Sequence, residues 1–307
     1  MSLRFGVLGT GYWAGETHAA GIVAHAGAEL VGVWGRNPAK AEALGRRFGV
    51  RGYEDLDALL EAVDAVAIAL PPDVQADLAV RAARAGRHLL LDKPLALSLE
   101  QARSVVEAAE AGGVASVIFF TWRFKPRVVA WLEALGSTGG WQGAQGTWFG
   151  SIFRPGSPYA ESAWRQSWGA LWDVGPHVLS LAIPALGPVE RVTAARGLGD
   201  TVHLLVGHRG GAASTLSVSL TVPEAAETTR FAVHGTAGWS AVPSDSTTVV
   251  EAFGEAISQL AGMIAAGTTE HPCDVRFGAE VVAILDAAER VLATPPDAAA
   301  APIQWRR

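Results

Sequence analysis

Short apolar runs alternate with longer, alanine-rich amphipathic segments through the first 120 or so residues. The apolar runs are the length of buried strands, and the segments between them have helical periodicity. Alternating strands and helices predict a parallel sheet with right-handed crossovers. Asp73 and Ser98 are expected N-caps, and Gly86 and Gly112 suit helix ends. The expected strands are Leu3–Leu8, Glu29–Trp34, Ala65–Leu70, His88–Leu91 and Val114–Phe120, and the helices between them fall within 38–49, 73–86 and 98–112.

The pattern changes after Phe120. A helix is expected over Pro126–Leu135, another starting near Pro176, and two more over Glu255–Ala266 and Phe277–Leu292. Runs typical of antiparallel strands, some joined by short glycine turns, suggest a meander. These runs are Ala144–Phe153, Val189–Arg196, Val202–Gly207, Ala212–Val222 and Thr229–His234.

The predicted fold class is α/β: an N-terminal Rossmann dinucleotide-binding domain, then an α+β domain with a large, mostly antiparallel open sheet. The boundaries are 1–121 and 122–307, and residues 294–302 are expected to be irregular. One face of the open sheet is free for self-association, which predicts a homodimer or homotetramer.

Composition narrows the possible partners. No apolar run approaches the roughly 18 residues of a membrane span, and no signal-type segment precedes the first strand, so we expect no membrane partner. A net charge of −6 argues against nucleic acid. The single cysteine, Cys273, excludes an intrachain disulfide and a cysteine-based zinc site, which fits a cytoplasmic protein.

A glycine turn follows the first strand, with the spacing G-x-G-x-x-A at Gly9, Gly11 and Ala14. Gly9 permits a tight turn, Gly11 lets the backbone approach a pyrophosphate, and Ala14 lets the helix, expected to run to about residue 26, lie close on its strand. The backbone amides of Thr10, Gly11, Tyr12 and Trp13 would then point at the phosphates. The alternative is a strand-to-helix turn that binds nothing.

The end of the second strand bears on cofactor choice. A site selective for NAD usually carries Asp or Glu there for the ribose 2′-hydroxyl, but this chain has Gly35, Arg36 and Asn37. Glycine leaves room for a 2′-phosphate, and a guanidinium can bond to it. Lys40 could add charge. We therefore predict NADP in preference to NAD, the alternative being that Arg36 is an ordinary exposed arginine.

Reactive groups follow two apolar segments. Asp92 and Lys93 come directly after a predicted strand, at the sheet rim that also holds Gly9, Gly35 and Leu70. Asp173 and His177 flank Pro176, which suits the first turn of a helix. His177 is a candidate acid/base with Asp173 beside it. Alone, Lys93 could be a surface lysine, Asp173 a cap and His177 a packed histidine. No third ligand stands nearby, so no metal site is expected.

Together these motifs resemble the glucose–fructose oxidoreductase / inositol dehydrogenase / rhizopine-catabolism (Gfo/Idh/MocA) oxidoreductases along essentially the whole chain. The resemblance implies a nicotinamide-dependent dehydrogenase in which Lys93 relays a proton or orients substrate and His177 is the general acid/base beside Asp173. It also implies that the Leu70-Pro71 turn is a wall of the dinucleotide site. The matching segments are 9–14, 69–72, 86–94, 122–126 and Asp173-x-Gly175-x-His177.

Three positions depart from the family pattern. Asp92 replaces the more frequent Glu, and this shorter carboxylate is still expected to hold the nicotinamide ribose. Gln75 stands where many members carry His, at the cofactor site, and Thr121 stands where Asn is common. None of these changes removes the lysine or the histidine. Activity is therefore expected, and the departures bear on the choice of substrate.

The predicted reaction is hydride transfer between the nicotinamide and a secondary alcohol or ketone, of a small-molecule sugar, cyclitol or related polyol. His177, assisted by Lys93, takes or returns the hydroxyl proton. The alternatives are a non-catalytic NADP-sensing regulator with the same fold and a dehydrogenase of a non-sugar diol. A loop after Arg154 is expected to supply aromatic contacts, although its tryptophans could equally pack a core or a subunit contact. The candidate substrate contacts are Arg123, Trp164, Arg165 and Trp168.

Overall fold

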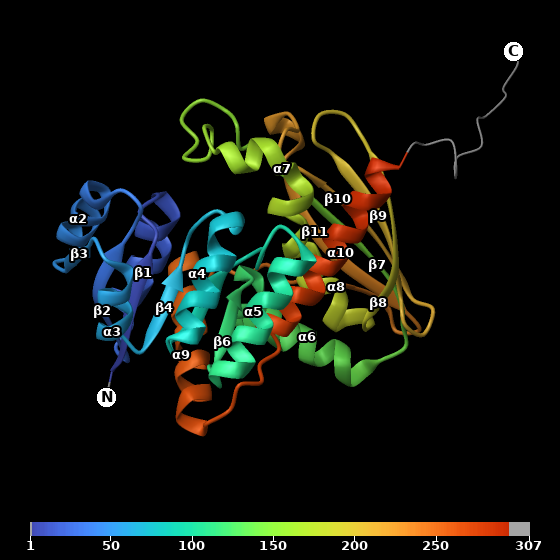
Figure 1. Cartoon of the computed structure of the whole chain (residues 1–307). Coiled ribbons are helices and arrows are strands. Elements are labelled where there is room, and N and C mark those ends of the chain that lie inside the picture. The colour runs from blue at the N-terminus through green and yellow to red at the C-terminus, as the bar shows by residue number, and fades with distance from the viewer. Residues whose placement is uncertain (1, 295–307) are drawn as a thin grey trace, which may run out of the picture.

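The protein is built on two six-stranded sheets, as the computed structural model of residues 2–294 shows (Figure 1). The first sheet is entirely parallel and has the order β3-β2-β1-β4-β5-β6. Five of its strands are those predicted, with ends shifted by up to two residues. The sixth, β3, was missed because it has three residues and no apolar alternation. The strands are β1 (Leu3–Leu8), β2 (Ala28–Trp34), β3 (Arg51–Tyr53), β4 (Ala65–Ile68), β5 (His88–Asp92) and β6 (Ser116–Phe119).

Helices connect these strands. The first is irregular: a π-helical stretch, Ala14–Ala19, runs into α1 (Ala20–Ala24), which ends two residues earlier than expected. Ser98 caps α5 by accepting from the Gln101 amide, but the Asp73 cap is wrong. Pro71 is the N-cap of α4, because Pro72 already occupies the first helical position. The short α3 was not predicted. The regular helices are α2 (Pro38–Arg47), α3 (Leu56–Ala62), α4 (Pro72–Arg84) and α5 (Leu99–Gly112).

The second sheet has the order β12-β11-β7-β10-β9-β8 and is mixed. All its neighbours are antiparallel except β7 and β10, which run parallel. This confirms a large, mostly antiparallel sheet but corrects the simple meander, because two helices follow β7 before the chain returns. The short β12 was not predicted. The strands are β7 (Trp141–Phe149), β8 (Val189–Arg196), β9 (Val202–His208), β10 (Ala213–Ser219), β11 (Thr228–Gly235) and β12 (Gly238–Ala241).

One face of the second sheet packs against helices and the other is open. Helix α8 lies against β7 and α10 against β8. On the opposite face the strand register aligns Leu205, Thr215, Gln145, Ala232 and Ala241, and Trp239 lies on the same face two residues before Ala241. Leu205 and Trp239 are 52% and 63% exposed. Both side chains lie on the face that is expected to self-associate, on strands β9 and β12.

The helices of the second half differ from prediction in one important place. Residues 164–172, expected in a loop, belong to α7, which is kinked at Gly169 with φ +65°. Helix α8 begins at Gly175, close to the predicted start. The elements are η2 (Thr121–Phe124), α6 (Pro126–Thr138), α7 (Ala163–Asp173), α8 (Gly175–Leu186), η3 (Glu224–Ala226), α9 (Val249–Ala266) and α10 (Val275–Ala293).

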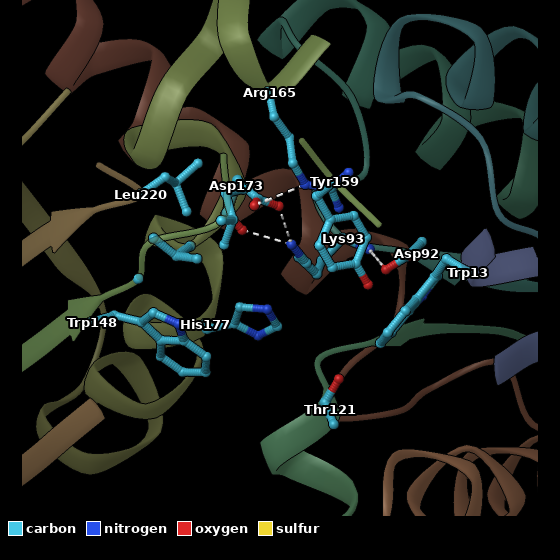
Figure 2. A pocket seen from close by; sticks show the side chains of 13 residues that line it. Trp13, Asp92, Lys93, Thr121, Trp148, Tyr159, Arg165, Asp173, His177 and Leu220 are labelled. Carbon is cyan, nitrogen blue, oxygen red and sulfur yellow. Dashed lines mark hydrogen bonds and ion pairs between the residues drawn. The ribbon is translucent and has the colours of Figure 1, made fainter. Parts of the chain in front are cut away.

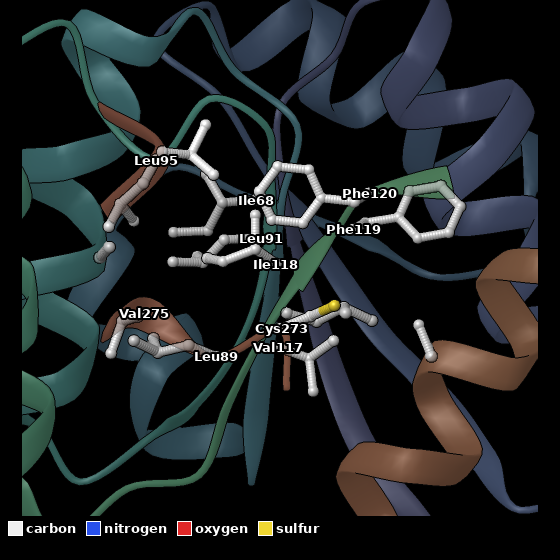
Figure 3. Close-up of a cluster of buried hydrophobic side chains, with 14 of the residues drawn as sticks. Ile68, Leu89, Leu91, Leu95, Val117, Ile118, Phe119, Phe120, Cys273 and Val275 are labelled. Atoms are coloured by element: carbon white, nitrogen blue, oxygen red, sulfur yellow. The ribbon is translucent and has the colours of Figure 1, made fainter. Parts of the chain in front are cut away.

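The last two helices return to the first sheet and join the two halves in one core. Helix α10 lies along α5, and α9 packs on α1 and β6 (Figure 1). The Ile118 amide of β6 donates to the Cys273 carbonyl at 2.7 Å, and Figure 3 shows Cys273 and Val275 among the apolar side chains of β4, β5 and β6. A Cβ at Gly21 would lie 2.6 Å from the Phe253 ring, so this glycine lets α9 approach closely.

Helix α9 is long and apolar enough to cross a membrane on length and composition alone, with a mean hydropathy of 1.3. Its buried residues, Phe253, Ile257 and Leu260 among them, face the first domain. Core packing therefore accounts for its apolar composition. The irregular tail expected from residue 294 onward lies, except for Thr294, outside the described residues.

Candidate active site

The glycine turn has the geometry that a phosphate group needs. Gly9 has φ +136°, and a Cβ there would stand 2.4 Å from the Ala69 carbonyl oxygen, so only glycine fits. Gly11 is different, because a Cβ there would meet no atom within 4 Å. No side chain or loop carbonyl among residues 2–294 accepts a hydrogen bond from the amides of 10–13. The turn is thus open to an anionic ligand rather than filled by protein.

Two adjoining cavities extend from this turn. The larger, of about 320 Å³, runs from the glycine turn past Leu70 and Pro71 to residues 158–165. The smaller, of about 160 Å³, lies between the first sheet and the start of α8 (Figure 2). Its lining residues are Trp13, Asp92, Lys93, Thr121, Trp148, Gly150, Ile152, Tyr159, Arg165, Asp173, Val174, His177 and Leu220. Trp13, Asp92, Lys93, Tyr159 and Arg165 line both cavities, so the two form one continuous site.

A buried carboxylate joins two cations in the smaller cavity. Lys93 Nζ donates to Asp173 Oδ1 at 2.8 Å and to the Asp173 carbonyl oxygen at 2.6 Å. Arg165 Nε donates to Asp173 Oδ2 at 3.0 Å. Burial by itself would raise the pKa of Asp173, but the charges of Lys93 and Arg165 and the lysine hydrogen bond lower it to about 2. Asp173 is therefore ionised and holds Lys93 at the rim of the sheet.

The imidazole of His177 lies in the same cavity. It stacks on the Trp148 indole with ring centroids 4.6 Å apart and planes at 13°. Its Nδ1 atom is buried without a partner among residues 2–294. Burial first, and then the charge of Lys93, lower the pKa of His177 well below 6.5. The ring is therefore neutral at neutral pH and able to accept a proton.

Asp92 and Gln75 shape the rim between the cavities. Asp92 Oδ1 accepts from the Lys93 amide at 2.8 Å, and Oδ2 lies 3.8 Å from Nε2 of the buried His18. Gln75, predicted to contact the cofactor, instead clamps the chain after β5. It donates to the carbonyls of Asp92 and Pro94 and accepts from the Asp92 amide. Fully buried, Gln75 positions Asp92 and lines neither cavity.

The predicted cofactor residues after β2, at positions 35–37, line neither cavity, whereas Leu70 and Pro71 line the larger one. A Cβ at Gly35 would lie 2.6 Å from Thr10 Cγ2. Packing against the glycine turn therefore explains this glycine, and the space beside it is already taken. Arg36 is exposed. Asn37 caps α2 by accepting from the Lys40 amide.

The four predicted substrate contacts divide into two pairs. Arg165 lines both cavities, and Trp164 lines the larger one beneath its guanidinium. Arg123 lines neither, because its guanidinium donates to the Ser180 carbonyl and lies over the Phe277 ring. Trp168 also lies elsewhere. It is 40% exposed, packs edge-on against Trp172, and borders a separate hollow near Asp200.

Several lining residues were not anticipated as part of the site, among them the aromatic residues Trp148 and Tyr159. Trp148 lies on β7, where an aromatic residue in an alternating strand reads as ordinary sheet packing. Tyr159 lies in the irregular segment between β7 and α7, which has no periodicity. The position of Tyr159 at the site follows only from its contact with Tyr12 of the glycine turn in the tertiary structure. Among the described residues no group of three or more His, Cys, Asp or Glu side chains could hold a metal ion.

Comparison with known proteins agrees with this geometry. Residues 3–120 match the family described as "Oxidoreductase family, NAD-binding Rossmann fold", and residues 144–241 match the "GFO/IDH/MocA C-terminal domain". An inositol 2-dehydrogenase of Rhizobium meliloti (strain 1021) is 36% identical over 137 residues, 44% of this chain and 41% of that protein. The sequence match thus spans about two fifths of the relative's length.

Solved structures match over nearly the whole chain. A putative myo-inositol dehydrogenase from Sinorhizobium meliloti 1021 is 27% identical, with a TM-score of 0.78 over 95% of this chain and 98% of that one. GenD2 from gentamicin A biosynthesis, solved in complex with NAD, shares the fold at 24% identity and a TM-score of 0.80, covering 95% and 94%. With both domains matched in order, the chain belongs to the Gfo/Idh/MocA family of oxidoreductases.

Proposed function

We propose that the protein is an NAD(P)-dependent dehydrogenase that transfers a hydride between the nicotinamide and a secondary alcohol or ketone of a sugar, cyclitol or related polyol. One observation supports this above the others: Lys93 lies where the cavity at the glycine turn meets the cavity that holds His177. A dinucleotide on the turn and an alcohol beside the imidazole would therefore meet at the lysine.

The larger cavity suits a dinucleotide, with the amides of 10–13 for the pyrophosphate and Leu70 and Pro71 as a wall. When bound, the nicotinamide ring accepts or supplies the hydride. His177 takes the hydroxyl proton as the alcohol is oxidised. Because its Nδ1 is buried, Nε2 is the nitrogen available to the substrate. The ammonium of Lys93, held by Asp173, stabilises the developing alkoxide.

The walls of the smaller cavity favour a compact polyol. Trp148, Ile152 and Leu220 offer apolar surface for C–H groups, while Lys93 and His177 offer partners for hydroxyls. A volume of about 160 Å³ is roughly half the low end of the range typical of drug-sized ligands, so it suits a single ring. The name of the Rhizobium relative, inositol 2-dehydrogenase, supports the same class.

Preference for NADP over NAD is part of the proposal, and it now rests on Arg36 and Lys40. Both are exposed just after β2, and no carboxylate stands at the end of that strand. Gly35 leaves no room for a 2′-phosphate, because the methyl of Thr10 fills the space beside it. Titration of the protein fluorescence with NADPH and NADH measures the preference. Tighter binding of NADH would reject it.

Self-association through the open sheet is a further part of the proposal. The exposed Leu205 and Trp239 on one face support it. Sedimentation velocity of the wild type and of Trp239→Glu tests it. A wild-type dimer or tetramer that the substitution dissociates is expected, and a wild-type monomer would reject it.

The central test is Lys93→Met, assayed with NAD⁺ and NADP⁺ against a panel of sugars, cyclitols and diols. We expect the substitution to abolish turnover and to leave NADPH binding intact, because Lys93 stabilises the alkoxide rather than the phosphates. Lys125→Met is the matched control, since Lys125 donates to the carbonyls of Asp245 and Thr247 and lines neither cavity. Undiminished turnover would reject the role of Lys93. Tight NADPH binding by a wild type that turns over none of the panel would favour the alternative of a nucleotide sensor.

A further inference from the structure

Tyr159 is an aromatic side chain of the second domain that lines both cavities of the site. It lies in the irregular segment between β7 and α7. Figure 2 shows its ring within the group of side chains that surround the smaller cavity, together with Lys93, Trp13 and His177. This position, at the junction of the cavities, is where a substrate ring would meet the nicotinamide.

The ring of Tyr159 is held from two sides. It packs edge to face with Tyr12 of the glycine turn, with centroids 6.0 Å apart and planes at 88°. The Arg165 guanidinium lies over it, 4.4 Å from the centroid. Arg165 is itself fixed by Asp173 and by the Ser162 hydroxyl. The segment around Tyr159 therefore has a defined position above the turn despite its irregular backbone.

The hydroxyl of Tyr159 has no such fixed partner. Among residues 2–294 its side chain makes no hydrogen bond, although a half-buried phenol usually finds one. Burial raises the pKa of Tyr159 to about 12. The group is therefore protonated and available as a hydrogen-bond donor at every pH at which the enzyme would work.

We propose that Tyr159 is a substrate-binding residue, whose hydroxyl donates to a substrate oxygen next to the reacting carbon while its ring braces Tyr12 against the bound dinucleotide. The inference rests on the proposed function and adds a residue outside the Lys93, Asp173 and His177 set. One side chain thus has two roles. The hydroxyl binds the substrate, and the ring packs against Tyr12 of the cofactor turn.

Two substitutions separate these tasks. Tyr159→Phe keeps the ring, so kcat/KM for the polyol should fall about 2- to 12-fold, the range for one neutral hydrogen bond. The Kd for NADH should stay within about 2-fold of the wild type. Tyr159→Leu also removes the aromatic contact with Tyr12, so the Kd for NADH should rise, by about 2- to 12-fold. Tyr53→Phe is the matched control, because Tyr53 also lies beneath an arginine, Arg51, but lines neither cavity.

A series of monodeoxy substrate analogues makes the test specific. With the wild type, one analogue, which lacks the hydroxyl that Tyr159 binds, should show a kcat/KM about 2- to 12-fold below that of the parent substrate. With Tyr159→Phe, the same analogue should show no loss relative to the parent substrate. Equal kcat/KM for wild type and Tyr159→Phe would overturn the substrate role. A rise in the Kd for NADH in Tyr159→Phe as large as in Tyr159→Leu would assign the hydroxyl to the cofactor instead. A wild type without turnover on any substrate would reject the proposed function itself. That result differs from an active enzyme whose kcat/KM is unchanged by Tyr159→Phe, which would reject only the substrate role of Tyr159.

Discussion

Replacing Asp173 by Asn tests how the site holds its charges. The carboxylate of Asp173 is 8% exposed and separates Lys93 from Arg165, at 2.8 Å and 3.0 Å. Asparagine keeps the shape but leaves two cations facing one neutral amide. Lowering the pKa of Asp173 from 3.8 to about 2 corresponds to about 2 kcal/mol of stability at neutral pH, at about 1.4 kcal/mol per pH unit. Removing one partner of a buried pair typically costs about 3–5 kcal/mol. We therefore expect a loss of about 3 kcal/mol.

Urea unfolding at several pH values measures this loss and its origin. The pKa of Asp173 is lower in the folded chain than in the unfolded chain, so its contribution is complete above about pH 4 and disappears as the pH falls toward 2. The gap between wild type and Asp173→Asn should stay constant from pH 7 to pH 5 and narrow below pH 4. The matched control is Asp57→Asn, which breaks an exposed pair with Arg81. It should cost less than about 1 kcal/mol.

Two results would refute this reasoning. A gap at pH 7 no larger than that of Asp57→Asn would mean that the buried carboxylate contributes no net stability. A gap as large at pH 3 as at pH 7 would mean that the loss comes from packing rather than charge. The double variant Asp173→Asn with Lys93→Met should recover part of the stability, because one of the two uncompensated cations is gone.

Three further predictions concern the cofactor turn and the pH dependence. Gly9→Ala should lower the free energy of unfolding in urea by at least about 2 kcal/mol, because alanine there needs a positive φ and meets the Ala69 carbonyl. Gly11→Ala should unfold like the wild type but raise the Kd for NADH about 10-fold or more, since its methyl occupies the phosphate side of the turn; equal stability of the two variants would contradict this. Arg36→Ala should weaken NADPH binding about 10-fold and NADH binding less than about 3-fold, as expected for one charged contact to a 2′-phosphate. Fluorescence titrations measure both affinities, and equal losses for the two cofactors would argue against that contact. The kcat/KM for alcohol oxidation should stay constant as the pH falls to about 6.5 and decline only below it. The reason is that burial and Lys93 lower the pKa of His177 and keep it a neutral base. A loss of kcat/KM on acidification with its midpoint above pH 7 would exclude His177 as that base.

Much of the fold was predictable because its signals are local. Apolar runs of strand length predicted five of the six strands in the first sheet, and β3 escaped because three residues carry no periodicity. The spacing of Gly9, Gly11 and Ala14 reflects steric demands within one turn, so it can be recognised without knowing the rest of the chain. The two segments that carry Lys93 and His177 were recognisable from their motifs.

Other parts of the site depend on contacts between distant segments. The segment of Trp164 and Trp168 contains Gly, Ser and Trp in an order that suits a loop, yet it folds as a helix kinked at Gly169. The kink and the packing on neighbouring elements decide which tryptophan faces the cavity. From the sequence, Arg123 was a plausible substrate contact. In the tertiary structure its guanidinium instead donates to the Ser180 carbonyl and lies over the Phe277 ring.

By itself the amino-acid sequence determined the strand–turn–helix at the amino end and the class of fold, because these follow from periodicity or from residues a few positions apart. It marked Lys93 and His177 as candidates only through the resemblance of their segments to the family motifs. Only the tertiary structure decided that Lys93 shares the carboxylate of Asp173 with Arg165, that Gln75 supports the rim and that Tyr159 closes over the turn. Lys93 and Asp173 are 80 residues apart. A pairing at that separation is set by how two domains pack, and no local pattern records it.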